Sequence, residues 1–213
     1  MTAKLEAVLI NVPPGEGDTG RGFAALPGRE TEFMASLGRA LDYARTIGCK
    51  RIHVLAGRTA ATAESEAAYV ANLQRAAALA QADGVRLLIE PLNAHDNPGY
   101  FLRTTQQAVA LLDCIARANV TMQFDFYHCQ ISEGDLARHA EALFGRYGHI
   151  QIAGVPDRHE PDRGEINYPF LLGLLDRLGY DGWVGCEYRP AAGTLAGLGW
   201  ARPWGITTPL KGP

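Results

Sequence analysis

Four oxygen-bearing side chains stand near the ends of four short apolar segments of the chain. Glu90 lies in LLIEPL, Asp125 in MQFDFY, Gln151 in HIQIAG and Glu187 in WVGCEY. A carboxylate in an apolar stretch is costly to desolvate unless it is paired or binds a cation. We therefore predict that these four residues hold a divalent cation. An all-oxygen ligand set favours Mg²⁺ or Mn²⁺ over zinc.

Two of these residues, Glu90 and Glu187, could also act as acid and base. One glutamate would remove a proton from a carbon next to a carbonyl group, and the other would return a proton. The enediolate oxygens formed between the two steps would be stabilised by the cation. The predicted reaction is therefore an aldose–ketose isomerisation or an epimerisation of a small hydroxy-carbonyl compound.

Three further residues could bind the oxygens of such a substrate. Arg158 lies in a charged loop, and its guanidinium group suits a carboxylate. His128 could orient the substrate or cap a helix, and His53, inside RIHVLAG, is either a substrate ligand or a satisfied core residue. The same loop also holds Glu160 and Glu165, which are candidate partners for Arg158 or Arg163.

The elements that must position these residues alternate regularly along the chain. Short apolar runs predict strands, and longer runs with apolar positions on one face predict helices. The predicted strands are Leu5–Val12, Arg51–Ala56, Val85–Glu90, Asn119–Asp125, His149–Ala153 and Trp183–Glu187. The predicted helices are Glu30–Ile47, Glu64–Ala82, Thr105–Arg117, Gly134–Phe144 and Pro169–Leu178, with FYHCQI (126–131) as a loop.

This alternation predicts an α/β fold with a parallel sheet, for which two architectures compete. A doubly wound sheet usually has a glycine-rich phosphate turn after its first strand, but PPGEGDTGRG lacks the G-x-G-x-x-G spacing. Polar residues at the ends of several strands are typical of a TIM (β/α)8-type barrel, whose active site lies at the carboxyl ends of its strands. We predict an incomplete barrel of this type, with six parallel strands.

The composition indicates one globular domain spanning residues 1–213, with 47% hydrophobic and 20% charged residues. The net charge is −3 and there is no basic block, so we expect no nucleic-acid partner. Apolar runs are shorter than a membrane span, so we expect no membrane partner either. The four cysteines form no C-x-x-C pair, which favours reduced, buried thiols and a cytoplasmic location.

Five runs of the chain carry a family resemblance. They are ALPGRE (25–30), LLIEPLN (87–93), QFDFYHCQ (123–130), HIQIAGVPDRHEPDRGEINY (149–168) and GWVGCEY (182–188). These runs resemble hydroxypyruvate isomerases, within the xylose-isomerase-like TIM barrel superfamily. The resemblance implies that Glu90 and Glu187 are the proton donor and acceptor, and that Glu90, Asp125, Gln151 and Glu187 surround a divalent-metal site. It implies the interconversion of 3-hydroxypyruvate and 2-hydroxy-3-oxopropanoate (tartronate semialdehyde), a carboxylate-bearing substrate.

The resemblance also marks a difference at the amino terminus. A complete barrel has eight βα units in about 250 residues, whereas this chain aligns from what would be the third strand. Two strand edges would then be open. We expect either that a partner chain covers them, as in a homo-oligomer, or that the isolated chain is unstable.

Other functions remain open on the sequence alone. A 2-oxo-tetronate isomerase or a ketose 3-epimerase could use the same glutamates, and a truncated, non-catalytic form could bind sugar acids. A DNA repair enzyme of the endonuclease IV type fits less well, because its multi-zinc site is rich in histidine and its surface is basic.

Overall fold

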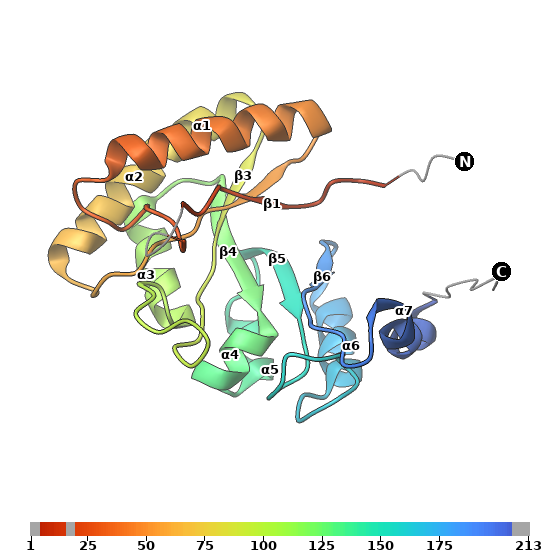
Figure 1. The fold of residues 1–213 in the computed structure, drawn as a ribbon. Coiled ribbons are helices and arrows are strands. Elements are labelled where there is room, and N and C mark those ends of the chain that lie inside the picture. Colours follow the sequence, from red (N-terminus) through yellow and green to blue (C-terminus); the bar gives the residue numbers. More distant parts are fainter. Residues whose placement is uncertain (1–4, 16–19, 206–213) are drawn as a thin grey trace.

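The computed structural model describes residues 5–15 and 20–205, which form a curled half-barrel. Its sheet has six parallel strands, and each strand pairs with the next one along the chain. The sheet does not close, because β1 and β6 stand at its two edges (Figure 1). The strands are β1 (Ile10–Asn11), β2 (Arg51–His53), β3 (Arg86–Ile89), β4 (Val120–Asp125), β5 (Tyr147–Ile152) and β6 (Val184–Cys186). The predicted incomplete barrel is thus confirmed.

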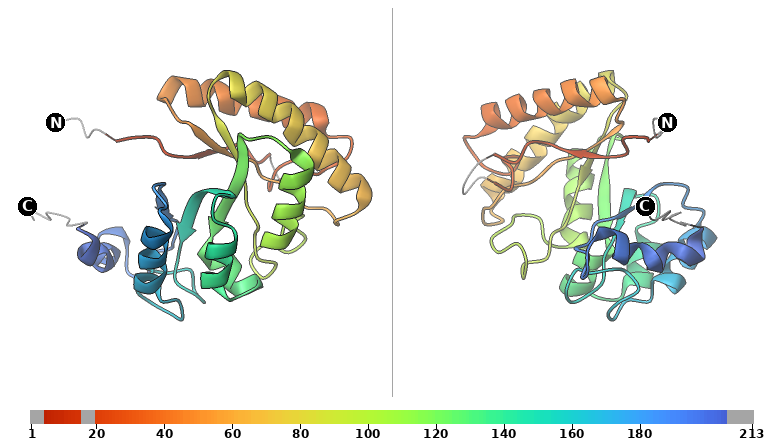
Figure 2. Two further views of the ribbon diagram at one scale, coloured as in Figure 1. Left: turned by 180° about the vertical axis from the view of Figure 1, so that it is seen from behind. Right: turned by 45° about the vertical axis from the view of Figure 1, so that its right-hand side comes forward.

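Helices connect the strands and cover the convex side of the sheet, so that the concave side is the barrel interior (Figure 2). Right-handed strand–helix–strand units pack in this way because each helix buries one apolar face on the sheet. The helices are α1 (Glu30–Ile47), α2 (Ala63–Ala82), α3 (Thr105–Ile115), α4 (Phe126–Ser132), α5 (Leu136–Ala142), α6 (Tyr168–Leu178), α7 (Thr194–Gly197) and the 3-10 helix η2 (Leu198–Trp204).

Local hydrogen bonds explain where several of these helices begin. Thr62 and Ser65 form a reciprocal capping box at α2, and the Asn167 side chain accepts a hydrogen bond from the Phe170 N–H at α6. The prediction of a loop over 126–131 was wrong, because Asp125 accepts a hydrogen bond from the Tyr127 N–H and starts α4 there. The capping residue Asp125 is also the last residue of β4, so its carboxylate lies at the carboxyl end of that strand.

Alternation along the strands separates an apolar face from a polar one. Ile52, Leu87 and Phe124 point toward the helices and belong to the main hydrophobic core. Their neighbours His53 and Gln123 are equally buried but face the barrel interior. Since TIM barrels usually fill their interior with branched apolar residues, this polar interior marks the site.

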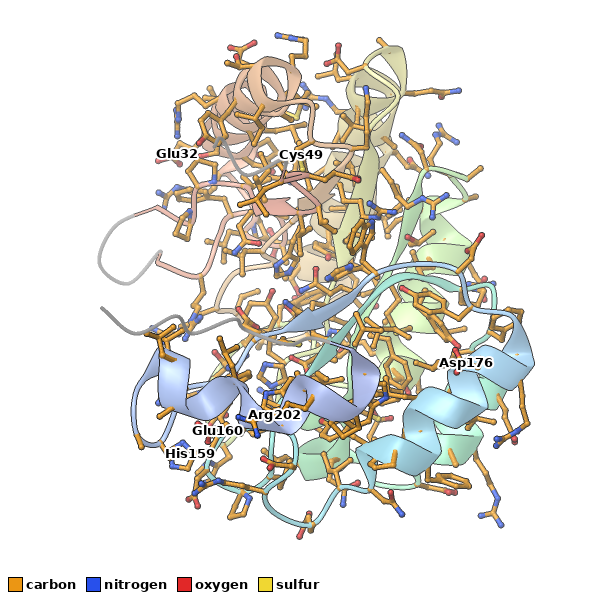
Figure 3. All side chains as sticks on the ribbon, turned by 90° about the vertical axis from the view of Figure 1, so that its right-hand side faces the viewer. Glu32, Cys49, His159, Glu160, Asp176 and Arg202 are labelled. Atoms are coloured by element: carbon orange, nitrogen blue, oxygen red, sulfur yellow. The ribbon has the colours of Figure 1, made fainter. Side chains whose placement is uncertain are left out.

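The cysteines and the carboxyl-terminal segment complete the fold. All four cysteines are free, but Cys114 and Cys186 are exposed, so the prediction of buried thiols holds only for Cys49 and Cys129. Figure 3 shows His159 and Glu160 beside the helical segment that carries Arg202. Within the described part of the chain, no helix is long and apolar enough to cross a membrane.

Candidate active site

The carboxyl ends of the strands bring the predicted residues to one cavity of about 90 Å³. Parallel pairing sets this arrangement, since Asp125 is in register with Gln151, and Gln151 with Gly185. Asp125 lies beside the cavity, 3.9 Å from two of its lining side chains. The cavity is lined by Asn11, Arg21, His53, Leu55, Glu90, Leu92, Asn97, Gln123, His128, Gln151, Arg158 and Glu187.

Two carboxyl groups of the site are almost completely buried, Glu90 at 4% and Asp125 at 3% exposure. Burial and the nearby charges of Asp125 and Glu187 raise the pKa of Glu90 well above its usual value. Burial also raises the pKa of Asp125 to about 7, although Arg158 opposes the rise. Among the described residues, Glu90 Oε1 and Asp125 Oδ2 have no hydrogen-bond partner.

These two unpartnered oxygens are what a cation site requires. Ligand atoms of Glu90, Asp125 and His128 lie within 4.8 Å of one another, all of them buried. A divalent cation would compensate two buried carboxylates, near which the described residues supply only the positive charge of Arg158, 3.9 Å from Asp125. The residues present therefore fit a cation.

Glu187 differs from the other carboxylates because it is paired. Its Oε2 lies 2.7 Å from Arg158 Nη2, and its backbone carbonyl accepts a bond of 3.3 Å from Arg158 Nε. The guanidinium group lies over the Tyr127 ring, 4.9 Å from its centroid. Glu160, expected to pair with Arg158 or Arg163, lies 3.8 Å from Arg163. Glu165, expected to pair with the same arginines, instead accepts a hydrogen bond from Gln130.

Both predicted histidines are buried in the cavity wall. His53 Nε2 lies 3.5 Å from Glu90 Oε2, and His128 Nε2 lies 3.9 Å from Asp125 Oδ2. Burial lowers the pKa of each ring to about 3, so both are neutral near pH 7. They can donate or accept hydrogen bonds without adding charge.

Sequence reasoning gave no role to several of the lining residues, among them the polar residues Arg21, Asn97 and Gln123. Gln123 Nε2 donates a hydrogen bond of 2.6 Å to Gln151 Oε1 and so orients a predicted cation ligand. Its position two residues before Asp125 could have identified it as a site residue from the sequence, because strand residues at i and i+2 share a face. Arg21 comes from the loop before α1, and no strand pattern marks it.

The chain belongs to the xylose isomerase-like TIM barrel family, whose model matches residues 2–204. It is 54% identical over 204 residues to a 2-oxo-tetronate isomerase of Cupriavidus necator, covering 94% of this chain and 78% of the relative. It is 44% identical over 205 residues to the hydroxypyruvate isomerase of Escherichia coli K12, covering 94% of this chain and 80% of the relative.

Solved structures show the same fold. A structure from Brucella melitensis described as an AP endonuclease of family 2 matches with a TM-score of 0.90 and 44% identity, covering 94% of this chain and 79% of that one. The 3-keto-D-glucoside 4-epimerase of E. coli matches with a TM-score of 0.76 at 22% identity, covering 93% and 80%, and shows the fold alone.

Proposed function

We propose that this protein is an isomerase that interconverts 3-hydroxypyruvate and 2-hydroxy-3-oxopropanoate. The observation that carries this proposal is that Glu90, Gln151 and Glu187 line one cavity and Asp125 lies beside it, all four at the ends of adjacent strands. Relatives named hydroxypyruvate isomerase and 2-oxo-tetronate isomerase support an isomerase of this kind. A cavity of about 90 Å³ favours a short substrate, since pockets for drug-sized ligands measure about 300–1,000 Å³.

A divalent cation, Mg²⁺ or Mn²⁺, would be held by Glu90, Asp125, Gln151 and Glu187. When bound, it would stabilise negative charge on the two substrate oxygens next to the reacting carbons. Support comes from the unpartnered oxygens of Glu90 and Asp125, which a cation would satisfy.

Glu90 and Glu187 would move the carbon-bound protons. One carboxylate takes a proton from C3 of hydroxypyruvate, and the other carboxyl group gives a proton to C2. The proton of the C3 hydroxyl group leaves as the aldehyde forms, and the oxygen on C2 gains one, so the substrate and product have the same composition.

The substrate oxygens would be bound by His128, His53 and two arginines. Arg158 is close enough to Glu187 to orient it, and its charge also suits the substrate carboxylate. Arg21 lines the same cavity from the loop before α1 and supplies a second positive charge. A negatively charged substrate is therefore favoured over a neutral ketose.

The direct test is turnover of hydroxypyruvate by the purified protein, with product followed by NMR. We expect activity with Mg²⁺ or Mn²⁺, loss of activity in EDTA and its return when the ion is added back. Tight binding of hydroxypyruvate without turnover would instead favour a non-catalytic sugar-acid-binding protein.

A second candidate is a 2-oxo-tetronate isomerase, favoured by the 54% identity to the Cupriavidus necator relative. The same assay with a four-carbon acid compares kcat/KM for the two substrates. A higher value for the four-carbon acid would replace the first candidate with the second. The site is less suited to an endonuclease, because its ligand set has more oxygen than histidine donors.

A further inference from the structure

Two N–H groups of one buried residue converge on a single ring nitrogen of His128. The Asn93 backbone N–H donates to His128 Nδ1 over 3.2 Å, and Asn93 Nδ2 lies 2.7 Å from the same atom. Asn93 follows β3 at 0% exposure, and His128 lies in α4 at 2% exposure. None of the roles described above for the site involves Asn93.

Other partners fix which end of the Asn93 amide faces the histidine. Asn93 Oδ1 accepts from the Asp96 N–H at 2.8 Å, and Nδ2 lies 3.1 Å from Asp96 Oδ2. A backbone N–H can only donate and a carboxylate can only accept, so a flipped amide would lose both bonds. Asp96 is itself held by the Tyr127 hydroxyl group, which donates to Oδ2 over 2.6 Å.

The amide orientation decides the tautomer of the ring. Since Nδ1 accepts from N–H donors, it carries no proton, and the neutral ring holds its proton on Nε2. Nε2 lies 3.9 Å from Asp125 Oδ2 at the cavity. A protonated Nε2 can donate a hydrogen bond but cannot coordinate a cation.

We propose that Asn93 is a positioning residue that keeps His128 in the Nε2–H tautomer, so that His128 donates a hydrogen bond to a substrate oxygen. The role toward substrate rests on the proposed isomerase function, whereas the tautomer does not. Distance alone would allow His128 to join Glu90 and Asp125 as a cation ligand. With the proton held on Nε2 by the contacts of Asn93, His128 cannot be a cation ligand, and only oxygen ligands remain.

The tautomer is tested by NMR of the ring nitrogens, using isotope-labelled histidine and His128→Gln to assign the signals. In the unsubstituted protein we expect an unprotonated Nδ1 and a protonated Nε2. Asn93→Asp replaces the nearer donor, at 2.7 Å, with an acceptor and keeps the backbone N–H at 3.2 Å, so a measurable fraction of the rings should carry the proton on Nδ1. Asn93→Ala keeps the backbone N–H and should keep the original tautomer. A protonated Nδ1 in the unsubstituted protein overturns the proposal without any variant.

A double-mutant cycle tests the catalytic consequence. Asn93→Asp should lower kcat by about 10²-fold, the effect of losing one donor to a developing negative charge. In the His128→Ala background the same substitution should cost little more, because its effect acts through that ring. Equal losses in both backgrounds would mean that Asn93 is only structural, and would overturn the proposal.

Asn119→Ala is the matched control for loss of a partly buried amide. Asn119 Nδ2 donates to the Ala77 carbonyl over 2.8 Å, at the start of β4 and away from the cavity. It should lower thermal stability without changing kcat or the His128 signals. If the unsubstituted protein does not turn over hydroxypyruvate, the proposed function fails, while the NMR experiment still decides the tautomer.

Discussion

The two glutamates with matching proposed roles lie in contrasting surroundings. Glu90 follows the internal strand β3, is 4% exposed and has an unpartnered carboxylate oxygen among the described residues. Glu187 follows the edge strand β6, and its side chain is 54% exposed and paired with Arg158. Glu90 is thus desolvated, whereas Glu187 is exposed and held by an ion pair, so the two proposed proton-transfer groups lie in different environments.

The largest expected effect removes either proton-transfer group. Glu90→Gln and Glu187→Gln should each lower kcat by about 10²- to 10⁴-fold, because each residue acts as acid or base. Steady-state kinetics with hydroxypyruvate and Mn²⁺ measures this loss. Glu165→Gln, in the exposed loop, is the control and should keep full activity. Near-normal turnover by Glu187→Gln would mean that Glu187 transfers no proton and that the buried Glu90 acts without it.

The buried carboxyl group of Asp125 should also make the stability of the metal-free protein depend on pH. The pKa of Asp125 is raised to about 7 in the fold, so the folded state holds this proton more tightly than the unfolded state. Taken alone, Asp125 should therefore lower the stability of the metal-free fold by up to about 4 kcal/mol as the pH rises from about 4 to 7. His53 and His128 oppose this trend, because their lowered pKa values make the fold gain stability over much of the same range. Denaturant unfolding of the unsubstituted protein and of Asp125→Asn in EDTA therefore measures the contribution of Asp125 as the difference between the two curves. The same pH dependence in both proteins would contradict the desolvated state of Asp125.

The stability of amide variants should separate the two glutamates further. Without metal, Glu90→Gln should stabilise the fold by about 1–3 kcal/mol, because it removes an ionisable group whose charged form is desolvated by burial. Glu187→Gln should change stability by less than about 1 kcal/mol, since an exposed ion pair contributes little. Unfolding by urea in EDTA at neutral pH compares them. Equal shifts would mean that burial does not distinguish the two sites.

Much of the fold follows from sequence because strand and helix signals are local. Each of the six strands was expected where it occurs, although β1 shrank from Leu5–Val12 to Ile10–Asn11. Helix α4 was missed because its start depends on the Asp125 cap, which is a contact and not a hydrophobic period. Local patterns predict elements better than they predict caps.

The site was partly predictable for a related reason. Strand-end residues such as Glu90 and Gln151 could be found because parallel pairing brings strand ends together. Contacts between distant loops have no such rule, so the pairing of Arg158 with Glu187 and of Asn93 with His128 required the structure. Those contacts decide which groups are charged, oriented or free to bind substrate.

Arg158 lies close to both the exposed Glu187 and the buried Asp125, and its conservative substitution has the smallest expected effect on activity. Its Nη2 lies 2.7 Å from Glu187 Oε2 and 3.9 Å from Asp125 Oδ2. Arg158→Lys keeps the charge but loses the planar guanidinium fork, so kcat/KM should fall about 10-fold, or about 1.4 kcal/mol. Arg163→Lys, on the exposed part of the same loop, should leave kinetics unchanged. If Arg158→Lys has as little effect as Arg163→Lys, a positive charge alone is enough to position Glu187. The second hydrogen bond, from Arg158 Nε to the Glu187 carbonyl, would then be dispensable.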